Sequence, residues 1–157
     1  LPNKESLLVC LHERYMAEGL KASVRVFEQG QNAPLEVRVQ KLCALMVDFH
    51  AANRGVTRAI TNTLFTRPSE EISDDVAAFG VNATAAFKQA AAFLAEAVDR
   101  EIHARPQVAC EFALLAAHDV AQSRVVFGDR SGLHINYSHR ALKARLTALV
   151  LSYLQHG

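Results

Sequence analysis

Apolar residues recur at helical spacing along almost the whole chain, and the pattern is broken at only a few points. The 157 residues include seven glycines and four prolines, and three of these prolines (Pro34, Pro68 and Pro106) separate one periodic segment from the next. The alternation of apolar and polar residues that is typical of strands is not found. Alanine-rich segments with so few helix-breaking residues predict an all-α protein, a bundle of about six helices in a single domain of residues 1–157.

Caps and breaks indicate where the helices begin and end. Asn3 is a favourable N-cap for the first helix, and segment 29–32 ends that helix. Pro106 suits the first turn of a helix, because its missing N–H would have no helical partner there. The acidic residues of segment 70–75 suit the positive end of a helix dipole. The predicted helices run from about Lys4 to Glu28, from near Leu35 to 53–55, from there to about Phe65, from about Glu70 to Ala104, from Pro106 to about Phe127, and from about Tyr137 to Leu154.

The last two predicted helices are apolar on more than one face. Such a helix must cover each apolar face, either inside its own domain or against a partner. Two adjacent helices with surplus apolar surface favour a four-helix interface across a two-fold axis, although central core helices of a monomer would show the same pattern. The residues that we assign to a dimer interface are Leu114, Ala121, Leu142, Leu146, Leu149 and Tyr153.

Charge and cysteine usage narrow the class of protein. The chain has 17 Lys and Arg residues against 16 Asp and Glu residues, a formal net charge of +1, whereas a domain that binds DNA by itself normally has a concentrated basic surface. No apolar run reaches the roughly 20 residues that cross a bilayer, and the charged N-terminal segment is unlike a signal peptide. Cys10, Cys43 and Cys110 each lie in an apolar helical pattern, which predicts reduced core thiols in a cytoplasmic protein.

The sequence contains no recognised catalytic or metal-binding motif. Patterns typical of phosphate loops, dinucleotide-binding turns, serine hydrolases and zinc proteases do not occur in it. His134 and His139 have neither the spacing nor the context of metal ligands, and His12, His103 and His156 sit among charged or terminal neighbours. These five histidines are therefore expected at the surface, and no catalytic residue, metal or cofactor is assigned.

Polar residues that interrupt apolar helical faces are better candidates for a binding site. A ligand pocket needs mostly apolar walls and a few convergent polar groups. A hydrogen-bonded core position or a surface position would also explain any single one of these residues, because buried polar groups need partners with or without a ligand. The candidate polar residues are His50, Asn53, Asn82, His118 and Gln122, and the candidate wall residues are Phe49, Phe79, Phe87, Phe93 and Phe112.

The opening segment, Leu1-Pro2-Asn3-Lys4-Glu5-Ser6-Leu7-Leu8, resembles the end of the helix-turn-helix domain in TetR-family transcription regulators. In that family a usually aromatic residue, a short turn and a Lys-Glu-x-Leu-Leu step lead from the recognition helix into the connecting helix. Leu1 stands here at the usually aromatic position, which departs from the family pattern. The order and length of the predicted helices along the rest of the chain are similar to those of the family's regulatory domain.

This resemblance implies a TetR-like C-terminal regulatory domain whose DNA-binding domain is absent from the chain. It implies a homodimer that binds a small, largely apolar effector inside the helical bundle, usually as a repressor that the effector releases from operator DNA. The first helix would carry the effector's preference for one bundle arrangement to the DNA-binding heads. Lys4 would contact a DNA phosphate in the intact protein only. The alternatives are a stand-alone helical interaction or cofactor-binding protein, and an enzyme with an unrecognised active site in the bundle.

Overall fold

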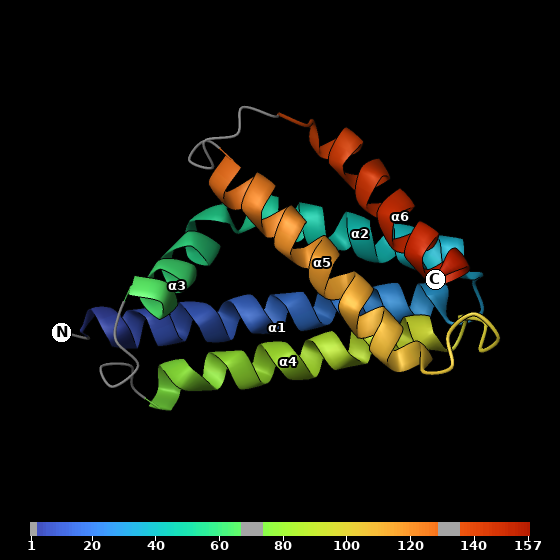
Figure 1. Cartoon of the computed structure of the whole chain (residues 1–157). Helices are drawn as coiled ribbons and strands as arrows, with labels where there is room; N and C mark the ends of the chain where they lie inside the picture. The colour runs from blue at the N-terminus through green and yellow to red at the C-terminus, as the bar shows by residue number, and fades with distance from the viewer. Residues whose placement is uncertain (1–2, 67–73, 129–135) are drawn as a thin grey trace.

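The computed structural model describes residues 3–66, 74–128 and 136–157. Within these ranges the backbone forms six helices and no strand (Figure 1), so the all-α bundle predicted from the sequence is confirmed. Leu1, Pro68, Glu70 and His134 lie outside the described residues. Across the described ranges, no helix is both long and apolar enough to cross a membrane. The helices are α1 (Lys4–Gly30), α2 (Leu35–Ala52), α3 (Arg54–Thr66), α4 (Asp74–Ala95), α5 (Pro106–Phe127) and α6 (His139–His156).

Local capping places several helix ends as predicted. The Asn3 side chain accepts a hydrogen bond of 2.8 Å from the Ser6 amide at the start of α1, and Pro106 stands in the first turn of α5. Ser138 caps α6 in the same way, by accepting a 3.2 Å hydrogen bond from the Ala141 amide. Each such cap contributes about 1 kcal/mol, because it pairs an amide that the helix itself leaves without a partner.

The end of α4 differs from the prediction. Its periodicity predicts a helix that continues to Ala104, but α4 ends at Ala95. The Ala97 amide donates to the Leu94 carbonyl over 2.9 Å, a tighter turn than an α-helix makes. Asp99 then closes a further turn, because its carboxylate accepts a 2.8 Å hydrogen bond from the amide two residues later. The prediction of a helix through Ala104 was therefore wrong.

Arg38 explains why the helical ladder stops at this point. This buried residue, 6% exposed, donates from its guanidinium to the carbonyl of Phe93, which a continuing α4 would use for its own hydrogen bond. The same group donates to the carbonyls of Gln31 and Ala33 after α1 and to the carboxylate of Glu96. Arg38 thus joins the C-terminal ends of α1 and α4, where helix dipoles favour a positive charge.

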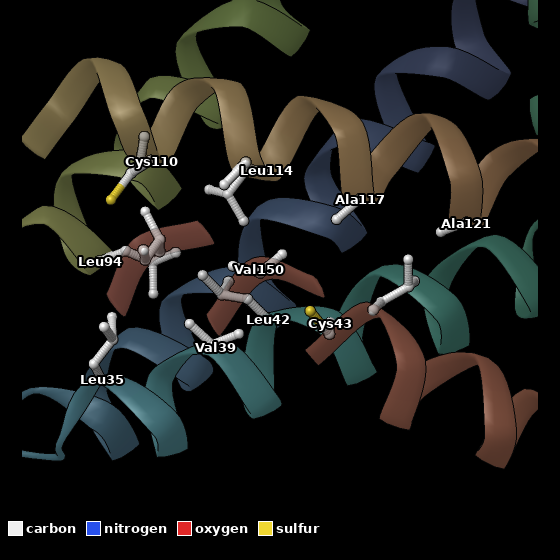
Figure 2. Close-up of a cluster of buried hydrophobic side chains, with 14 of the residues drawn as sticks. Leu35, Val39, Leu42, Cys43, Leu94, Cys110, Leu114, Ala117, Ala121 and Val150 are labelled. Carbon is white, nitrogen blue, oxygen red and sulfur yellow. The ribbon is translucent and has the colours of Figure 1, made fainter. Parts of the chain in front are cut away.

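Helix α5 lies at the centre of the packing. It contacts α2, α4, α6 and α3, while α1 runs beside α4 and also packs on α2 and α3 (Figure 1). Alanine occupies every fourth position on the buried side of α5, and these small side chains let the neighbouring helices approach closely. Figure 2 shows two of these alanines above side chains of α2 and α6. The alanines of this row are Ala109, Ala113, Ala117 and Ala121.

The buried apolar side chains form two clusters of unequal size. The main core joins α2, α4, α5 and α6 around Leu94, Leu114 and other fully buried residues. A smaller cluster of Leu8, Ile60 and Phe79 joins α1, α3 and α4 at the other end of the bundle. The space between these clusters is where the candidate site lies.

The cysteines follow the prediction in two positions of three. Cys43 and Cys110 are buried thiols, and burial raises the pKa of Cys43 to about 11 and that of Cys110 to about 12. Neither thiol is therefore ionised near neutral pH. Cys10 is exposed, so its assignment to the core was wrong. Its helix is only partly covered by its neighbours, since Leu7 and Leu20 on the same helix are also exposed.

Candidate functional site

Two adjoining hollows open between the main core and the smaller cluster. The first, which we name the α2 hollow, has a volume of about 180 Å³ and lies between α1, α2, α4 and α5. The second, the α3 hollow, has a volume of about 200 Å³ and lies between α1, α3, α4 and α5. Both are lined by Tyr15, Met16, Ala83 and His118. The two hollows are therefore neighbours that share these side chains in their walls.

The walls of the α2 hollow are mainly apolar. Three alanines on one face of α4 (Ala83, Ala86 and Ala90) line it, and their short side chains leave the space open. Gly19 of α1 faces Phe49 so closely that a Cβ atom there would lie 3.2 Å from the ring. Besides Tyr15 and Met16, the larger apolar side chains of the lining are Leu20, Leu42, Leu45, Met46, Phe49 and Phe87.

His50 is the polar group buried most deeply in the wall of the α2 hollow. Its side chain comes from the last turn of α2, the residue is only 3% exposed, and its Nδ1 atom has no hydrogen-bond partner among the described residues. Burial lowers the pKa of His50 to about 4, and the neighbouring His118 adds to this effect. The imidazole is therefore neutral near pH 7, with one nitrogen that donates and one that accepts.

His118 of α5 stands between the two hollows. Its ring centre lies 5.0 Å from that of His50 and 5.8 Å from that of Phe87, with the rings edge to face. Its Nδ1 atom lies 3.3 Å from a carboxylate oxygen of Asp119, which is mostly exposed. Edge-to-face contacts hold aromatic rings in defined orientations. The His118 ring is thus held in one orientation where it lines both hollows.

The α3 hollow adds further ring and hydroxyl groups. The His12 ring stacks on Phe79 at 3.5 Å between ring centres, and burial lowers the pKa of His12 despite the nearby Glu13. Thr57 is 3% exposed and is a side-chain hydrogen-bond partner of Tyr15. Burial also raises the pKa of Tyr15. The lining thus offers neutral polar groups in an apolar setting.

Acidification from pH 7 to pH 5 is expected to lower the free energy of unfolding by about 2 kcal/mol through His50 alone. The folded chain holds the pKa of His50 at about 4, below the ordinary 6.5, so the unfolded chain takes up the proton first. This stability is complete above pH 6.5 and is lost as the pH falls towards 4. Urea unfolding at a series of pH values measures it.

The matched variants for this measurement are His50→Phe and His156→Phe. The first removes the buried titrating ring and should flatten the pH dependence, leaving a smaller slope in the same direction from His12. The second replaces an exposed histidine and should keep the wild-type slope. Equal slopes in wild type and His50→Phe would contradict the burial of a neutral His50.

The structure brings six of the predicted pocket residues to the hollows. The α2 hollow is lined by Phe49, His50, Phe87 and His118. The α3 hollow is lined by Phe79, Gln122 and again His118. These residues come from α2, α4 and α5, which the sequence identifies as separate helices without showing how they meet.

Four other pocket candidates lie elsewhere. Asn53 closes α2, because both its backbone and its side-chain amide donate to the Phe49 carbonyl over 3.0 Å. Asn82 is exposed on α4, and Phe112 is 61% exposed on α5. Phe93 is packed in the main core, where its ring lies 4.7 Å from the Arg38 guanidinium carbon. The structure does not bring these four residues to either hollow.

Sequence reasoning missed the contribution of α1 and α3 to the site. His12 is expected at the surface because of its charged neighbours, but it is 4% exposed, so that expectation was wrong. Its spacing from Leu8 and Tyr15 is helical and could have placed it on the buried face. His103 is half-buried, with Nε2 3.0 Å from the Tyr153 carbonyl. His139 and His156 are exposed as predicted.

The residues assigned to a dimer interface divide into two groups. The structure buries four of them in the chain's own core, each no more than 3% exposed: Leu114, Ala121, Leu142 and Leu146. The side chains of these four cannot meet a second copy unless the bundle opens. Leu149 is 51% exposed and Tyr153 is half-buried, so these two reach the surface.

The outer faces of α5 and α6 both carry exposed apolar side chains. Phe112 contacts Tyr153 with 5.5 Å between ring centres, which joins the two helices there. Val108 and Leu115 are 45% and 51% exposed and share the face of Phe112 by helical spacing. We name Val108, Phe112, Leu115, Leu149 and Tyr153 the α5–α6 surface. Clustered exposed apolar side chains of this kind mark interaction sites more often than isolated ones do.

Lys4 is exposed and lines a separate groove of about 340 Å³ between α1 and α3. Two further hollows, of about 450 Å³ and 540 Å³, are larger than the α2 and α3 hollows. Exposed side chains form much of the lining of all three. The α2 and α3 hollows differ because they combine buried rings with buried polar side chains, and the Nδ1 atom of His50 has no hydrogen-bond partner among the described residues.

Comparisons of the chain with protein-family models, curated protein sequences and solved structures found no match. The chemistry of the hollows and of the α5–α6 surface is therefore the basis for inferring a function.

Proposed function

We propose that the chain is the effector-binding and dimerisation domain of a TetR-like transcription regulator, a cytoplasmic repressor that a small apolar ligand releases from DNA. The observation that carries this proposal is the pair of adjoining hollows with apolar walls and the buried His50, whose Nδ1 atom has no partner among the described residues. A site of this composition suits binding of a small molecule, because apolar walls supply affinity and a few polar groups fix orientation.

The position of α1 supports a route from ligand to DNA. Tyr15, Met16, Gly19 and Leu20 of this helix form one wall of the α2 hollow, opposite α2 and α4. A ligand that fits one spacing of these helices better than another shifts the bundle towards that spacing. In TetR-like regulators the DNA-binding domain precedes this helix, so a tilt of α1 would change the separation of the two heads on an operator.

The near-neutral charge of the chain is consistent with a regulator in which this domain binds the ligand and a separate domain binds DNA. With a net charge of +1, the chain by itself is expected not to bind DNA, and operator binding would require the preceding domain. The unpaired thiols Cys43 and Cys110 suit a reducing cytoplasm. Lys4 would contact a phosphate only in the intact regulator.

Ligand binding can be tested with the neutral apolar dye N-phenyl-1-naphthylamine, whose fluorescence rises in apolar sites. The wild-type chain is expected to bind the dye in a saturable way. The variant Ala86→Leu, which fills the α2 hollow from α4, should weaken binding by at least about tenfold, because the displaced dye loses its apolar contacts.

The matched control for this test is Ala144→Leu, which adds the same side chain at an exposed position of α6 outside both hollows. It should bind the dye as the wild type does. Circular dichroism and urea unfolding check that both variants remain folded. Equal dye binding by Ala86→Leu and Ala144→Leu would show that the dye does not occupy the α2 hollow and would remove the support for an effector site.

Dimerisation is expected to use the α5–α6 surface. The wild-type chain should sediment with twice the 17.2 kDa mass of one chain. The double variant Phe112→Asp and Leu149→Asp places carboxylates where two copies would bury apolar side chains, and it should be monomeric with the stability of its fold retained. Analytical ultracentrifugation over a range of concentrations measures this change.

The control for the dimer test is Val81→Asp. Val81 is 70% exposed on α4, so this change introduces one carboxylate at an exposed apolar position outside the α5–α6 surface. It should leave the dimer intact. A wild-type monomer, or a dimer that survives the Phe112→Asp and Leu149→Asp changes, would contradict the proposed interface.

A further inference from the structure

The α2 hollow has one buried polar group whose hydrogen bonding is incomplete. His50 lines this hollow, is 3% exposed and leaves Nδ1 without a partner among the described residues. A buried nitrogen in this condition has lost its bond to water without replacing it, which costs free energy. Nδ1 is itself buried, so a ligand atom in the hollow supplies the missing hydrogen bond once the imidazole ring turns this nitrogen towards the hollow, and the cost is then recovered only in the bound state.

The charges of the side chains that line the hollow indicate whether the polar group of a ligand is ionised or neutral. The described lining of the α2 hollow contains no carboxylate, lysine or arginine, and its second imidazole, His118, already lies beside the Asp119 carboxylate. An ionised ligand group would therefore lose its hydration there without gaining a free counter-charge. Burial lowers the pKa of His50 to about 4, which keeps the imidazole neutral at pH 7. A hydroxyl group matches a neutral imidazole in either tautomer, because it can both donate and accept.

The side chains that line the hollow also indicate which hydrocarbon part of a ligand would fit it. Phe49, Phe87 and Met46 offer ring faces, ring edges and a thioether to one space, and these groups pack favourably on aromatic ligands. Ala86 and Ala90 line the same space from α4, the helix that also carries Phe87, and contribute only methyl groups, whereas Phe49 and Met46 come from α2. A flat ring system fits between such walls better than a branched aliphatic one does.

We propose that the α2 hollow binds a neutral aromatic molecule that carries a hydroxyl group, with the rings against Phe49 and Phe87 and the hydroxyl hydrogen-bonded to His50. This inference rests on the effector-binding function proposed above and names the chemical class of the effector. His50 provides the hydrogen bond to the ligand hydroxyl. The ring of His118 packs against His50 and limits where that hydroxyl can lie.

Three naphthalene derivatives of nearly equal size test this inference on the full 157-residue chain at pH 7. The probes are 2-naphthol (neutral hydroxyl), 2-methylnaphthalene (no polar group) and 2-naphthoate (anion). Because the chain has no tryptophan, probe fluorescence can be followed with little protein background. We expect 2-naphthol to bind about fivefold more tightly than 2-methylnaphthalene, the factor that one neutral hydrogen bond supplies, and 2-naphthoate to bind most weakly.

The variants are His50→Phe, which keeps a ring but removes the nitrogen, and the exposed control His156→Phe. His50→Phe should bind 2-naphthol and 2-methylnaphthalene equally, whereas His156→Phe should keep the fivefold preference. The imidazole ¹⁵N signals of His50 in the wild-type chain provide a second measurement, which does not depend on how well the variant folds. They should shift on addition of 2-naphthol and not on addition of 2-methylnaphthalene.

The outcomes separate this inference from the function on which it rests. Four results would overturn the hydrogen bond to His50 and leave an apolar effector site. The wild type could bind 2-methylnaphthalene as tightly as 2-naphthol, or the preference for 2-naphthol could survive in His50→Phe. The His50 signals could fail to shift with 2-naphthol, or 2-naphthoate could bind most tightly. Failure of all three probes to bind would overturn the cavity as a ligand site and the proposed function with it.

Discussion

Replacement of Arg38 by alanine is expected to lower the free energy of unfolding by about 3 to 4 kcal/mol. The guanidinium donates to the carbonyls of Gln31, Ala33 and Phe93 and to the carboxylate of Glu96. Its loss leaves carbonyls at the ends of α1 and α4 without partners and removes the cation that packs on the Phe93 ring. Urea unfolding followed by circular dichroism measures the change.

Two further variants show whether the hydrogen-bond geometry or only the charge matters. Arg38→Lys keeps the charge, but its single ammonium cannot reach three carbonyls in one plane, so about half of the loss should remain. Arg14→Ala removes an exposed arginine paired with Glu18 in the next turn and should change stability by no more than about 0.5 kcal/mol. Equal stability of Arg38→Ala and Arg14→Ala would contradict a structural role for Arg38.

Leu114→Ala is expected to destabilise the chain by about 3 kcal/mol, because it opens a cavity in the main core. Leu114 is fully buried between α5 and the neighbouring helices, as Figure 2 shows. The loss should be the same at every protein concentration, since the side chain packs within one chain. If Leu114 lay between two chains, the loss of stability would instead depend on concentration.

Phe112→Ala is the matched control for Leu114→Ala. It lies two residues away on the same helix but is 61% exposed, so its truncation should cost less than about 1 kcal/mol of chain stability. Its effect should appear in the dissociation of the dimer instead. Opposite results for the two variants, with Leu114→Ala affecting association and Phe112→Ala affecting stability, would contradict the orientation of α5.

Residues within one turn of each other determined much of the secondary structure. The helix starts at Lys4, Leu35 and Pro106 agree with the prediction, because caps, prolines and apolar spacing act locally. The start of α6 differs by two residues, since Ser138 rather than an earlier residue supplies the cap. These signals are readable from a single sequence because no distant contact is needed to produce them.

The candidate site was predictable only in part. Polar interruptions of apolar faces selected His50, His118 and Gln122, which the structure places at the hollows. The same criterion also selected Asn53 and Asn82, which close a helix end and face solvent. A polar residue at helical spacing carries no information about which neighbouring helix faces it, so pattern alone could not separate these two groups.

The sequence by itself determined that this protein is helical, where most helices begin, and that one or more polar groups interrupt its apolar faces. Only the tertiary structure decided that Leu114 faces the core and Phe112 the surface, because α5 is apolar on nearly every side and its orientation depends on which helices pack against it. The tertiary structure also decided the end of α4, since Arg38 takes the Phe93 carbonyl from a position 55 residues away in the sequence. Long-range contacts of this kind override local preferences, and the packing of separate helices creates the space around His50 that no segment of the chain encodes alone.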